Sequence, residues 1–437
     1  MKIKVVFISL FFLLFNSSCI SGVYYVHFYE PIYMSLNDVE NNIKLTKPRK
    51  IRNVEKIYTY KNYLFISSEN MGIHIIDNSN PKNPINKGFL QIPLNQDISI
   101  KNDVLYADSM NQIVSIDISN LEKISILKKI KFDLPYSIGR FSIDPEKGLV
   151  IGYKNSVDYR ARVITPKVFV PTPTSIDNRL TSSSSSTGKG GSLARFSIVN
   201  DYLYTVTNSD INVFSLKDEK NPEKIGKVEV DINRRDIETI YAYKDKLFMG
   251  SSTGAYIYDN KNPQKPEFIS KIEHIRSCDP IVVENDTAYI TLRSGVSCRG
   301  GSNQLDVVDI KDLKLPKIVK SYPLRKPWGL AIKDSMLYVC DYEDGLKIFD
   351  AKEAENLKEL KVININTPKD IILNENNLGI IISDDGIYEY DFSNLNEYQK
   401  LEPLSYIKSE KTPIEQDPYY PKKEGYNAWY KEYFLDN

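Results

Sequence analysis

Histidine and net charge are both scarce in this 437-residue sequence. The three histidines, His27, His74 and His274, lie far apart without ligand-like spacing, which argues against a histidine-based metal or acid–base centre. His74 lies within a strand-like stretch, and we expect it to be a packing residue. Basic and acidic residues balance at 57 each, so the sequence shows no electrostatic footprint for nucleic acid.

Long hydrophobic runs are also lacking, apart from one of 11 residues, Val5–Phe15. This run is too short for a stable membrane anchor, but it follows Lys2 and Lys4 and is typical of an export signal. No second run of transmembrane length follows it. We therefore expect an exported chain whose remaining part is water-soluble and globular.

The end of this N-terminal segment, Ser17-Ser18-Cys19, resembles a bacterial lipobox, in which cleavage leaves an acylated cysteine. Asn16 departs from the pattern, because an aliphatic residue is usual there. The alternative is an ordinary secretory signal cleaved near Ser21-Gly22. We expect Cys19 to carry lipid and to tether the protein to a membrane. Ile20, which replaces an inner-membrane retention Asp, favours the outer membrane of the cell envelope.

Helical spacing is hard to find between Arg52 and Ile407, where a strand-like stretch recurs instead. Its copies are GIHIID (72–77), QIVSID (112–117), DINVFS (210–215), GAYIYD (254–259), QLDVVD (304–309), GLKIFD (345–350) and GIYEYD (386–391). Their last residues lie 40, 98, 44, 50, 41 and 41 positions apart, and the doubled gap indicates a degenerate copy at Gly148. Eight units of this length indicate a repeat protein.

Each unit reads as an alternating strand, a tight polar turn such as Asn102-Asp103, two apolar strands and a further strand such as INKGFLQI (85–92). This pattern predicts an all-β fold: a single β-propeller of about eight four-stranded blades, or seven if the Gly148 copy forms none. The alternative is a β-solenoid, whose shorter parallel coils lack paired hairpin turns. The first unit lacks a leading strand, so we expect the C-terminal strand (399–407) to complete it and close the ring.

Asn-Pro steps follow several of the repeated strands, as at Asn80-Pro81, Asn83-Pro84 and Asn262-Pro263. Proline lacks an N–H donor and cannot continue a central strand ladder. We therefore expect these steps to move the chain from one blade to the next.

The strand-Asp ending with its following NP-x-x-P resembles the LVIVD repeat of bacterial surface proteins, and in particular LVIVD-containing lipoproteins. The resemblance spans nearly the whole mature chain, and its segments are YEPIYMS (29–35), GIHIIDNSNPKNP (72–84), VLYADS (104–109), GGSLARFSIVNDYLYTV (190–206), RSCDPIVV (276–283), TLRSGVSCRGGSNQLDVVDI (291–310) and YVCDYEDGLKIFD (338–350). It implies a propeller and an envelope location, and it carries over no catalytic residues.

Cys278 and Cys298 are twenty residues apart in a chain predicted to be exported, and we expect them to form a disulfide. Two reduced thiols are the alternative. The same stretch predicts a recognition loop, with residues suited to carboxylates or interface contacts: Arg276, Asp279, Arg293, Arg299 and Asn303. Pairing of Arg with Asp that only shapes the loop is the other interpretation. Cys340 ends an apolar strand and is expected to be a small core residue.

Motifs for enzymatic chemistry are weak in this sequence, and we predict no metal site, no cofactor and no catalytic residues. GSSTG (250–254) matches a nucleophile motif by letter, but it joins two strands where a strand-to-helix turn is required. GKGGS (188–192) lacks the ends of a phosphate-binding loop. The acidic stretches 341–345 and 384–386 fall at hairpin turns and lack the glutamate of a calcium loop.

The predicted organisation is a signal peptide (1–18), an N-terminal tether (19–50), the propeller (51–407) with a Ser- and Pro-containing insertion (153–195), and an aromatic-containing tail (408–437). The predicted function is a non-enzymatic, lipid-anchored scaffold that binds an envelope protein or glycan. The alternative is a secreted hydrolase or lactonase-like enzyme. That alternative requires carboxylate, Asn or His side chains from several blades to converge at one end of the axis, and a cluster of three or more would favour it.

Overall fold

The structure is a computed structural model that describes residues 26–68, 70–131, 137–138, 141–158, 189–207, 209–230, 237–252, 254–273, 280–294, 302–394 and 401–410. Antiparallel strands dominate these residues, and α1 (Leu36–Asn41) is the one helix among them. No helix of this part of the chain is both long enough and apolar enough to cross a membrane.

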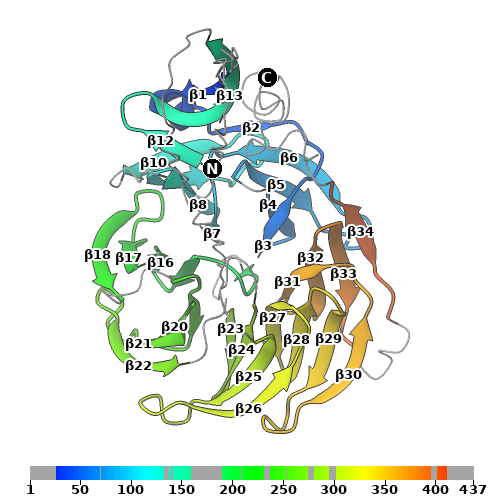
Figure 1. Ribbon diagram of the computed structural model, residues 1–437. Helices are drawn as coiled ribbons and strands as arrows, with labels where there is room; N and C mark the ends of the chain where they lie inside the picture. Colours follow the sequence, from blue (N-terminus) through cyan, green and yellow to red (C-terminus); the bar gives the residue numbers. More distant parts are fainter. Residues whose placement is uncertain are drawn as a thin grey trace, which may run out of the picture.

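In the described residues, seven antiparallel units surround a common axis and form a β-propeller (Figure 1). Within each unit, or blade, four consecutive strands pair in chain order from the inside outwards. The innermost strands contact one another in the order β3, β7, β15, β19, β23, β27, β31 and again β3. Apolar side chains of neighbouring blades fill the space between them and form the core.

The four strands of each blade follow one order, although their lengths differ. Blades 1 and 2 are β3 (Val54–Tyr60), β4 (Tyr63–Ser68), β5 (Gly72–Asp77), β6 (Ile85–Gln91), then β7 (Ile98–Lys101), β8 (Val104–Ser109), β9 (Gln112–Asp117), β10 (Ser125–Lys131). Blades 3 and 4 are β15 (Phe196–Val199), β16 (Tyr202–Val206), β17 (Asp210–Ser215), β18 (Glu223–Glu229), then β19 (Tyr241–Tyr243), β20 (Lys246–Ser251), β21 (Gly254–Asp259), β22 (Glu267–Glu273). Blades 5 and 6 are β23 (Ile281–Glu284), β24 (Thr287–Leu292), β25 (Gln304–Asp309), β26 (Lys317–Pro323), then β27 (Pro327–Lys333), β28 (Met336–Asp341), β29 (Gly345–Asp350), β30 (Lys358–Ile363). Blade 7 is β31 (Pro368–Leu373), β32 (Leu378–Ser383), β33 (Gly386–Asp391), β34 (Ser405–Lys408).

The Gly148 copy forms a sheet outside this ring, so the described part of the chain forms seven blades and not eight (Figure 1). This satellite sheet contains β11 (Ser137–Ile138), β12 (Phe141–Asp144), β13 (Gly148–Asp158) and, on the free edge of β13, β1 (Val26–Met34). The N-terminal strand β1 thus supplies the third strand that the degenerate copy lacks. Met34 and Leu149 pack with Met71 and Leu94 of the ring, which places the sheet over blades 1 and 2.

The N-terminal segment predicted as a tether also reaches blade 1. β2 (Lys44–Thr46) of this segment pairs with β6 on the outer edge of that blade. On the inner edge, β14 (Lys189–Gly190), from a later part of the chain, pairs with β3. Residues 26–46 therefore contribute two strands and α1 to the folded part of the chain.

The predicted closure of the ring by the C-terminal strand is wrong. β34 pairs with β33 and completes blade 7, whereas blade 1 has its own innermost strand, β3. The first and last blades contact through apolar side chains of β3–β5 and β31–β33 and through a hydrogen bond of 2.7 Å from Asn78 Nδ2 to Glu389 Oε2. Packing between these blades, together with an isolated parallel bridge between Arg52 and Glu410 just beyond β34, replaces the shared strand that we had expected.

The Asn-Pro steps do not connect blades, which corrects a second prediction. Asp77 at the end of β5 pairs with Ile85 at the start of β6, so Asn80-Pro81 lies in a hairpin within blade 1. The Asp77 carboxylate accepts a hydrogen bond from Ser79 N at 3.0 Å, and the strand-ending Asp of other blades forms the same turn. The repeated aspartate is thus a turn former.

The turns between first and second strands match the predicted polar hairpins. Asn102 and Asp103 have φ values of 46° and 64°, the left-handed conformation that two-residue hairpin turns need. These turns all lie at the end of the ring where the innermost strands finish. We call the opposite end, where the innermost strands begin and where second strands turn into third strands, the entry face.

Candidate functional site

Residues 189–196 run through the middle of the ring, and we call them the axial segment. Lys189 and Gly190 form β14 beside Thr59 and Tyr58 of β3, and Gly191 N donates to Ile57 O at 3.3 Å. Beyond Gly191 the chain turns at the entry face and becomes β15 of blade 3. The segment therefore adds a strand to the inner edge of blade 1 before it enters its own blade.

One position recurs around the inside of the ring, directly before the inner-strand residue that pairs with the fourth residue of the second strand. We call the residues at this position the collar: in blades 1 to 7 they are Lys56, Asp97, Arg195, Thr239, Pro280, Gly329 and Asp370. Charged residues of alternating sign occupy four consecutive blades, which are 7, 1, 2 and 3.

Asp370 of the collar accepts hydrogen bonds from the first half of the axial segment. Its Oδ1 accepts from Ser192 N at 2.9 Å and from Ser192 Oγ at 2.7 Å, and its Oδ2 accepts from Leu193 N at 3.2 Å. The side chain is buried, and burial raises the pKa of Asp370 to about 7 against the effect of these hydrogen bonds.

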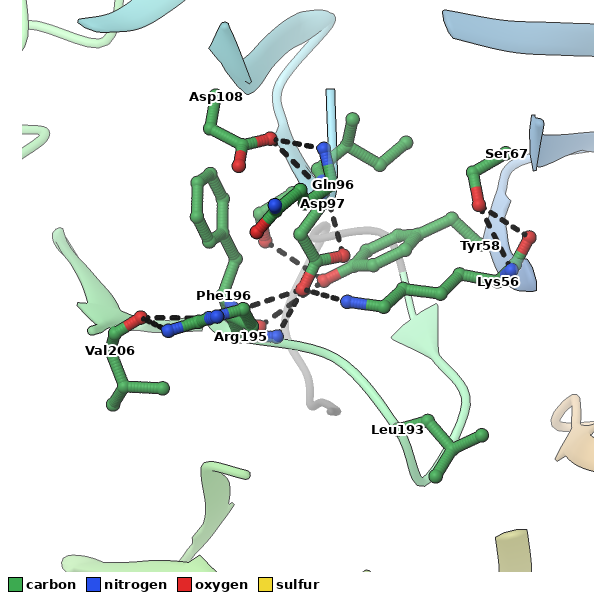
Figure 2. A network of polar contacts seen from close by, with 12 residues as sticks. Lys56, Tyr58, Ser67, Gln96, Asp97, Asp108, Leu193, Arg195, Phe196 and Val206 are labelled. Carbon is green, nitrogen blue, oxygen red and sulfur yellow. Dashed lines mark hydrogen bonds and ion pairs between the residues drawn. The ribbon is translucent and has the colours of Figure 1, made fainter. Parts of the chain in front are cut away.

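Asp97 accepts hydrogen bonds from the second half of the segment (Figure 2). Its Oδ2 accepts from Arg195 N and, at 3.2 Å, from Phe196 N, and it also lies 3.3 Å from Lys56 Nζ. Burial raises the pKa of Asp97 and lowers that of Lys56, while the attraction between the two charges opposes both shifts. Two collar carboxylates on different blades thus accept four backbone N–H groups of one segment. Each carboxylate accepts from two consecutive residues.

Arg195 continues the charge alternation but directs its guanidinium elsewhere. Nε and Nη2 donate to Val206 O at 2.9 and 2.8 Å, which fixes the start of blade 3 to its own second strand (Figure 2). In Figure 2, Arg195 contacts Asp97 through its backbone N–H group and not through its guanidinium. Burial lowers the pKa of Arg195.

Asp108 positions Asp97 from the neighbouring strand. Its Oδ1 accepts from the backbone N–H groups of Gln96 and Asp97, both at 2.8 Å, and from Asn95 Nδ2 at 2.8 Å. These bonds fix the chain that crosses from blade 1 into blade 2. Burial raises the pKa of Asp108 to about 6.

Glycine is required at two places where the axial segment touches the ring. A Cβ at Gly190 would lie 2.7 Å from the Tyr58 ring, and a Cβ at Gly191 would collide with Asp370 Oδ2. At the collar of blade 6, a Cβ on Gly329 would collide with Asp370 and lie 2.7 Å from Ser192 Oγ. The segment and the collar are therefore complementary in shape as well as in hydrogen bonding.

Ser192 links the segment to a fourth blade. Its hydroxyl donates to Asp370 and accepts from Leu330 N at 2.7 Å, where Leu330 belongs to blade 6. The segment thus contacts blades 1, 2, 6 and 7 and continues into blade 3. Two buried carboxylates, those of Asp97 and Asp370, contact this stretch, and the half-buried Asp108 lies behind Asp97. Among the described residues, no His, Cys, Asp and Glu group of three or more is arranged to hold a metal ion.

Two residues of the predicted recognition loop, Arg293 and Asn303, are described, and both lie at the entry face of blade 5. The Arg293 guanidinium carbon is 3.6 Å from the Trp328 ring centroid, and Trp328 stacks on Tyr342 at 5.6 Å. Asn303 Oδ1 accepts from Ser294 N at 2.8 Å, so the two ends of the loop are joined. The other predicted residues lie outside the described part of the chain: Cys19, Arg276, Cys278, Asp279, Cys298 and Arg299.

Other residues considered in the sequence have structural positions. His74 is buried, 4.7 Å from the Phe89 ring, and burial together with Arg49 lowers its pKa to about 3, which confirms a packing role. Cys340 is a buried thiol of β28, as predicted. Asp341 accepts from Arg325 N and Lys326 N, both at 2.9 Å, and so stabilises a turn.

Sequence reasoning missed the collar and the axial segment. A usable signal was present, because an aspartate directly precedes an apolar inner strand in DISI (97–100) and in DIIL (370–373). The small residues of GGS (190–192) gave a second signal, but they stood at the end of an insertion and were interpreted as part of it.

Comparisons with known proteins agree with this architecture. The family model for the LVIVD repeat matches residues 51–90 and 95–128, which correspond to blades 1 and 2. No curated protein matches the chain at a significant level.

Solved structures show the fold alone. A protein from Lactobacillus plantarum is similar with a TM-score of 0.52 and 12% identity over 81% of this chain and 96% of its own. The computationally designed Ika8 protein is similar with a TM-score of 0.50 and 8% identity over 83% of this chain and 88% of its own. The WD40 beta propeller domain of Doa1 gives a TM-score of 0.45 and 8% identity over 79% of this chain and 96% of its own. This chain is a β-propeller that carries LVIVD repeats in its first two blades.

Proposed function

We propose that this protein is a non-enzymatic scaffold of the cell envelope, which binds a protein or glycan partner and is tethered to a membrane by lipid on Cys19. The observation that carries the proposal is the use of the axial carboxylates. Asp97 and Asp370 accept backbone N–H groups of the chain itself, at the place where a propeller enzyme would gather its reacting groups.

The entry face of blade 5 is the proposed partner surface. Arg293 and Asn303 lie at the ends of one loop there. In the sequence, Arg276 and Asp279 precede the first strand of blade 5, and Arg299 stands between Arg293 and Asn303. Loops on a rigid scaffold carry recognition more often than the scaffold itself does. Arginine suits such a surface because its planar group pairs with carboxylates and stacks on aromatic rings.

The envelope location rests on the sequence of the N-terminus. Lys2 and Lys4, the apolar run Val5–Phe15 and the lipobox-like Ser17-Ser18-Cys19 together favour export and acylation. Labelling with radioactive palmitate should mark the wild type and not a Cys19→Ala variant. An unlabelled wild type would contradict the lipid tether.

Capture of partners from detergent-solubilised envelope tests the binding role. The wild type should retain a partner that an Arg276→Ala/Arg299→Ala variant loses. Lys261→Ala is the matched control, because this lysine is 73% exposed in a turn of blade 4 away from the entry face, and the control should retain the partner. Equal capture by all three proteins would show that blade 5 is not the binding surface.

A hydrolase acting at the axis is the second candidate, and the convergence of Asp97, Asp108 and Asp370 favours it. The raised pKa values of Asp108 and Asp370, about 6 and about 7, suit groups that exchange protons near neutral pH. Turnover of lactones and esters by the wild type, abolished in a folded Asp370→Asn variant, would establish this activity and overturn the scaffold proposal.

A further inference from the structure

The axial segment contacts the ring mainly through its main chain and its smallest side chains. β14 adds to the inner edge of β3 as an extended strand, the mode by which many proteins bind peptides in trans. Gly191 N donates to Ile57 O, and Ser192 N and Leu193 N donate to the Asp370 carboxylate. Any peptide in the same extended conformation offers these N–H groups.

The ring groups that make these contacts are held in place by other parts of the ring. Asp370 is 1% exposed, and Ile371 N donates to its Oδ1 at 3.0 Å, so the carboxylate has a fixed orientation. Leu330 N of blade 6 and Ile57 O of blade 1 are main-chain groups of innermost strands. Three groups on three blades thus form a preorganised surface for one stretch of peptide.

Side-chain selectivity comes from the lack of space at two positions and from one hydroxyl. Positions equivalent to Gly190 and Gly191 exclude a Cβ, because Tyr58 and Asp370 occupy that space. The next position favours serine, whose hydroxyl donates to Asp370 and accepts from Leu330 N. Leu193 follows and is 4% exposed, so an apolar residue suits the fourth position.

We infer that the ring surface that holds the axial segment is a peptide-binding groove, which recognises an extended Gly-Gly-Ser-apolar sequence by its main chain and which the chain's own residues 190–193 occupy in cis. None of the hydrogen bonds from Gly191, Ser192 and Leu193 to the ring requires the covalent link to residues before Lys189. A peptide of another molecule can therefore form the same bonds once the chain's own residues leave the groove. This site is separate from the blade 5 surface and goes beyond the scaffold function proposed above.

A variant that cannot seat its own segment tests the inference. In Gly191→Val the new side chain collides with Asp370, which should vacate the groove. A fluorescein-labelled peptide with the sequence of residues 189–194, Lys-Gly-Gly-Ser-Leu-Ala, should then bind the full-length variant at least tenfold more tightly than the wild type, as measured by fluorescence anisotropy. The same peptide should raise the thermal midpoint of the variant and leave that of the wild type unchanged.

The control peptide carries the same substitution as the variant, Lys-Gly-Val-Ser-Leu-Ala, and should bind neither protein. If Gly191→Val does not fold, Ser192→Ala replaces it, because that change removes two hydrogen bonds of the segment and adds no atom to the groove. Absence of saturable binding to the folded variant, or equal binding of both peptides, would overturn the inference. Neither result depends on the envelope partner, so failure here is distinguishable from failure of the scaffold proposal.

Discussion

The collar divides the ring into two parts that share a backbone and differ in their side chains. In blades 7, 1, 2 and 3 the collar residues are charged, and two of them accept the N–H groups of the axial segment. In blades 4, 5 and 6 the same position holds Thr239, Pro280 and Gly329. Thr239 Oγ1 accepts from Gly250 N of its own blade at 2.7 Å.

This difference teaches how a repeat protein acquires a local function. The strand register is the same in both parts, so the repeat determines where the collar residue stands. The individual side chain then determines whether that place holds the axial segment, leaves room for it as Gly329 does, or only completes its blade. Four predictions test this division.

The largest effect is expected when one charged collar residue is removed. Asp370→Ala leaves the buried N–H groups of Ser192 and Leu193 without their acceptor, which should lower the free energy of unfolding by about 3–5 kcal/mol. Thr239→Ala is the matched control in the uncharged part and should cost about 1 kcal/mol, because the hydrogen bond from Gly250 N is lost. Urea unfolding followed by tryptophan fluorescence measures both. Equal losses would remove the distinction between the two parts.

The second prediction concerns the coupling of Lys56 and Asp97. Asp97→Asn leaves the buried Lys56 amino group without its carboxylate, and Lys56→Met removes the charge that Asp97 faces. The double variant should be less destabilised than the sum of the single variants by about 1–3 kcal/mol. A double-mutant cycle measures this coupling, and strictly additive losses would show that the two charges act independently.

The third prediction concerns pH. Burial raises the pKa of Asp370 from 3.8 to about 7, so between these values the folded chain binds a proton that the unfolded chain does not. The resulting stability is complete below pH 3.8 and is lost as the pH rises through about 7. Between pH 5.5 and 7.5 the Asp370 contribution should fall by about 2 kcal/mol.

The urea midpoint of the wild type should therefore be higher at pH 5.5 than at pH 7.5. Asp108, whose pKa is raised to about 6, adds a smaller change of the same sign. In Asp370→Asn the pH dependence should be clearly weaker. A wild type that gains stability as the pH rises through this range would contradict the assignment.

The smallest effect is expected outside the collar. Arg293→Ala removes the contact with Trp328 and should lower the free energy of unfolding by about 1 kcal/mol, without changing the protection of the axial segment. Hydrogen exchange of residues 189–196 in this variant should match the wild type. Faster exchange there would mean that blade 5 and the axis are coupled.

The repeated features of the fold could be predicted from the sequence because each is written many times. The strand-ending aspartate, the Asn102-Asp103 turn and the four-strand unit all appear in the structure as expected. The number of blades was harder to predict, because the Gly148 copy lacks the third strand of the repeat but keeps the others. The direct contact of β7 with β15 and the pairing of β1 with β13 place that copy outside the ring.

The axial site could not be predicted because it depends on contacts between residues far apart in the chain. Ser192 and Asp370 are 178 positions apart, and Arg195 and Asp97 are 98 apart. An aspartate before a strand has an ordinary local interpretation as a turn residue, and nothing in its neighbours reveals a distant backbone partner. The predicted recognition loop, by contrast, rests on local sequence, and the structure describes only Arg293 and Asn303 of it.

Hydrogen–deuterium exchange of the axial segment tests the account most directly. The N–H groups of Ser192, Leu193, Arg195 and Phe196 should exchange as slowly as those of the core strands. Asp370→Asn should speed exchange at the first two, and Asp97→Asn should speed it at the last two. Exchange of all four at the rate of an exposed turn, such as residues 80–83, would contradict the claim that collar carboxylates hold the segment in the axis of the ring.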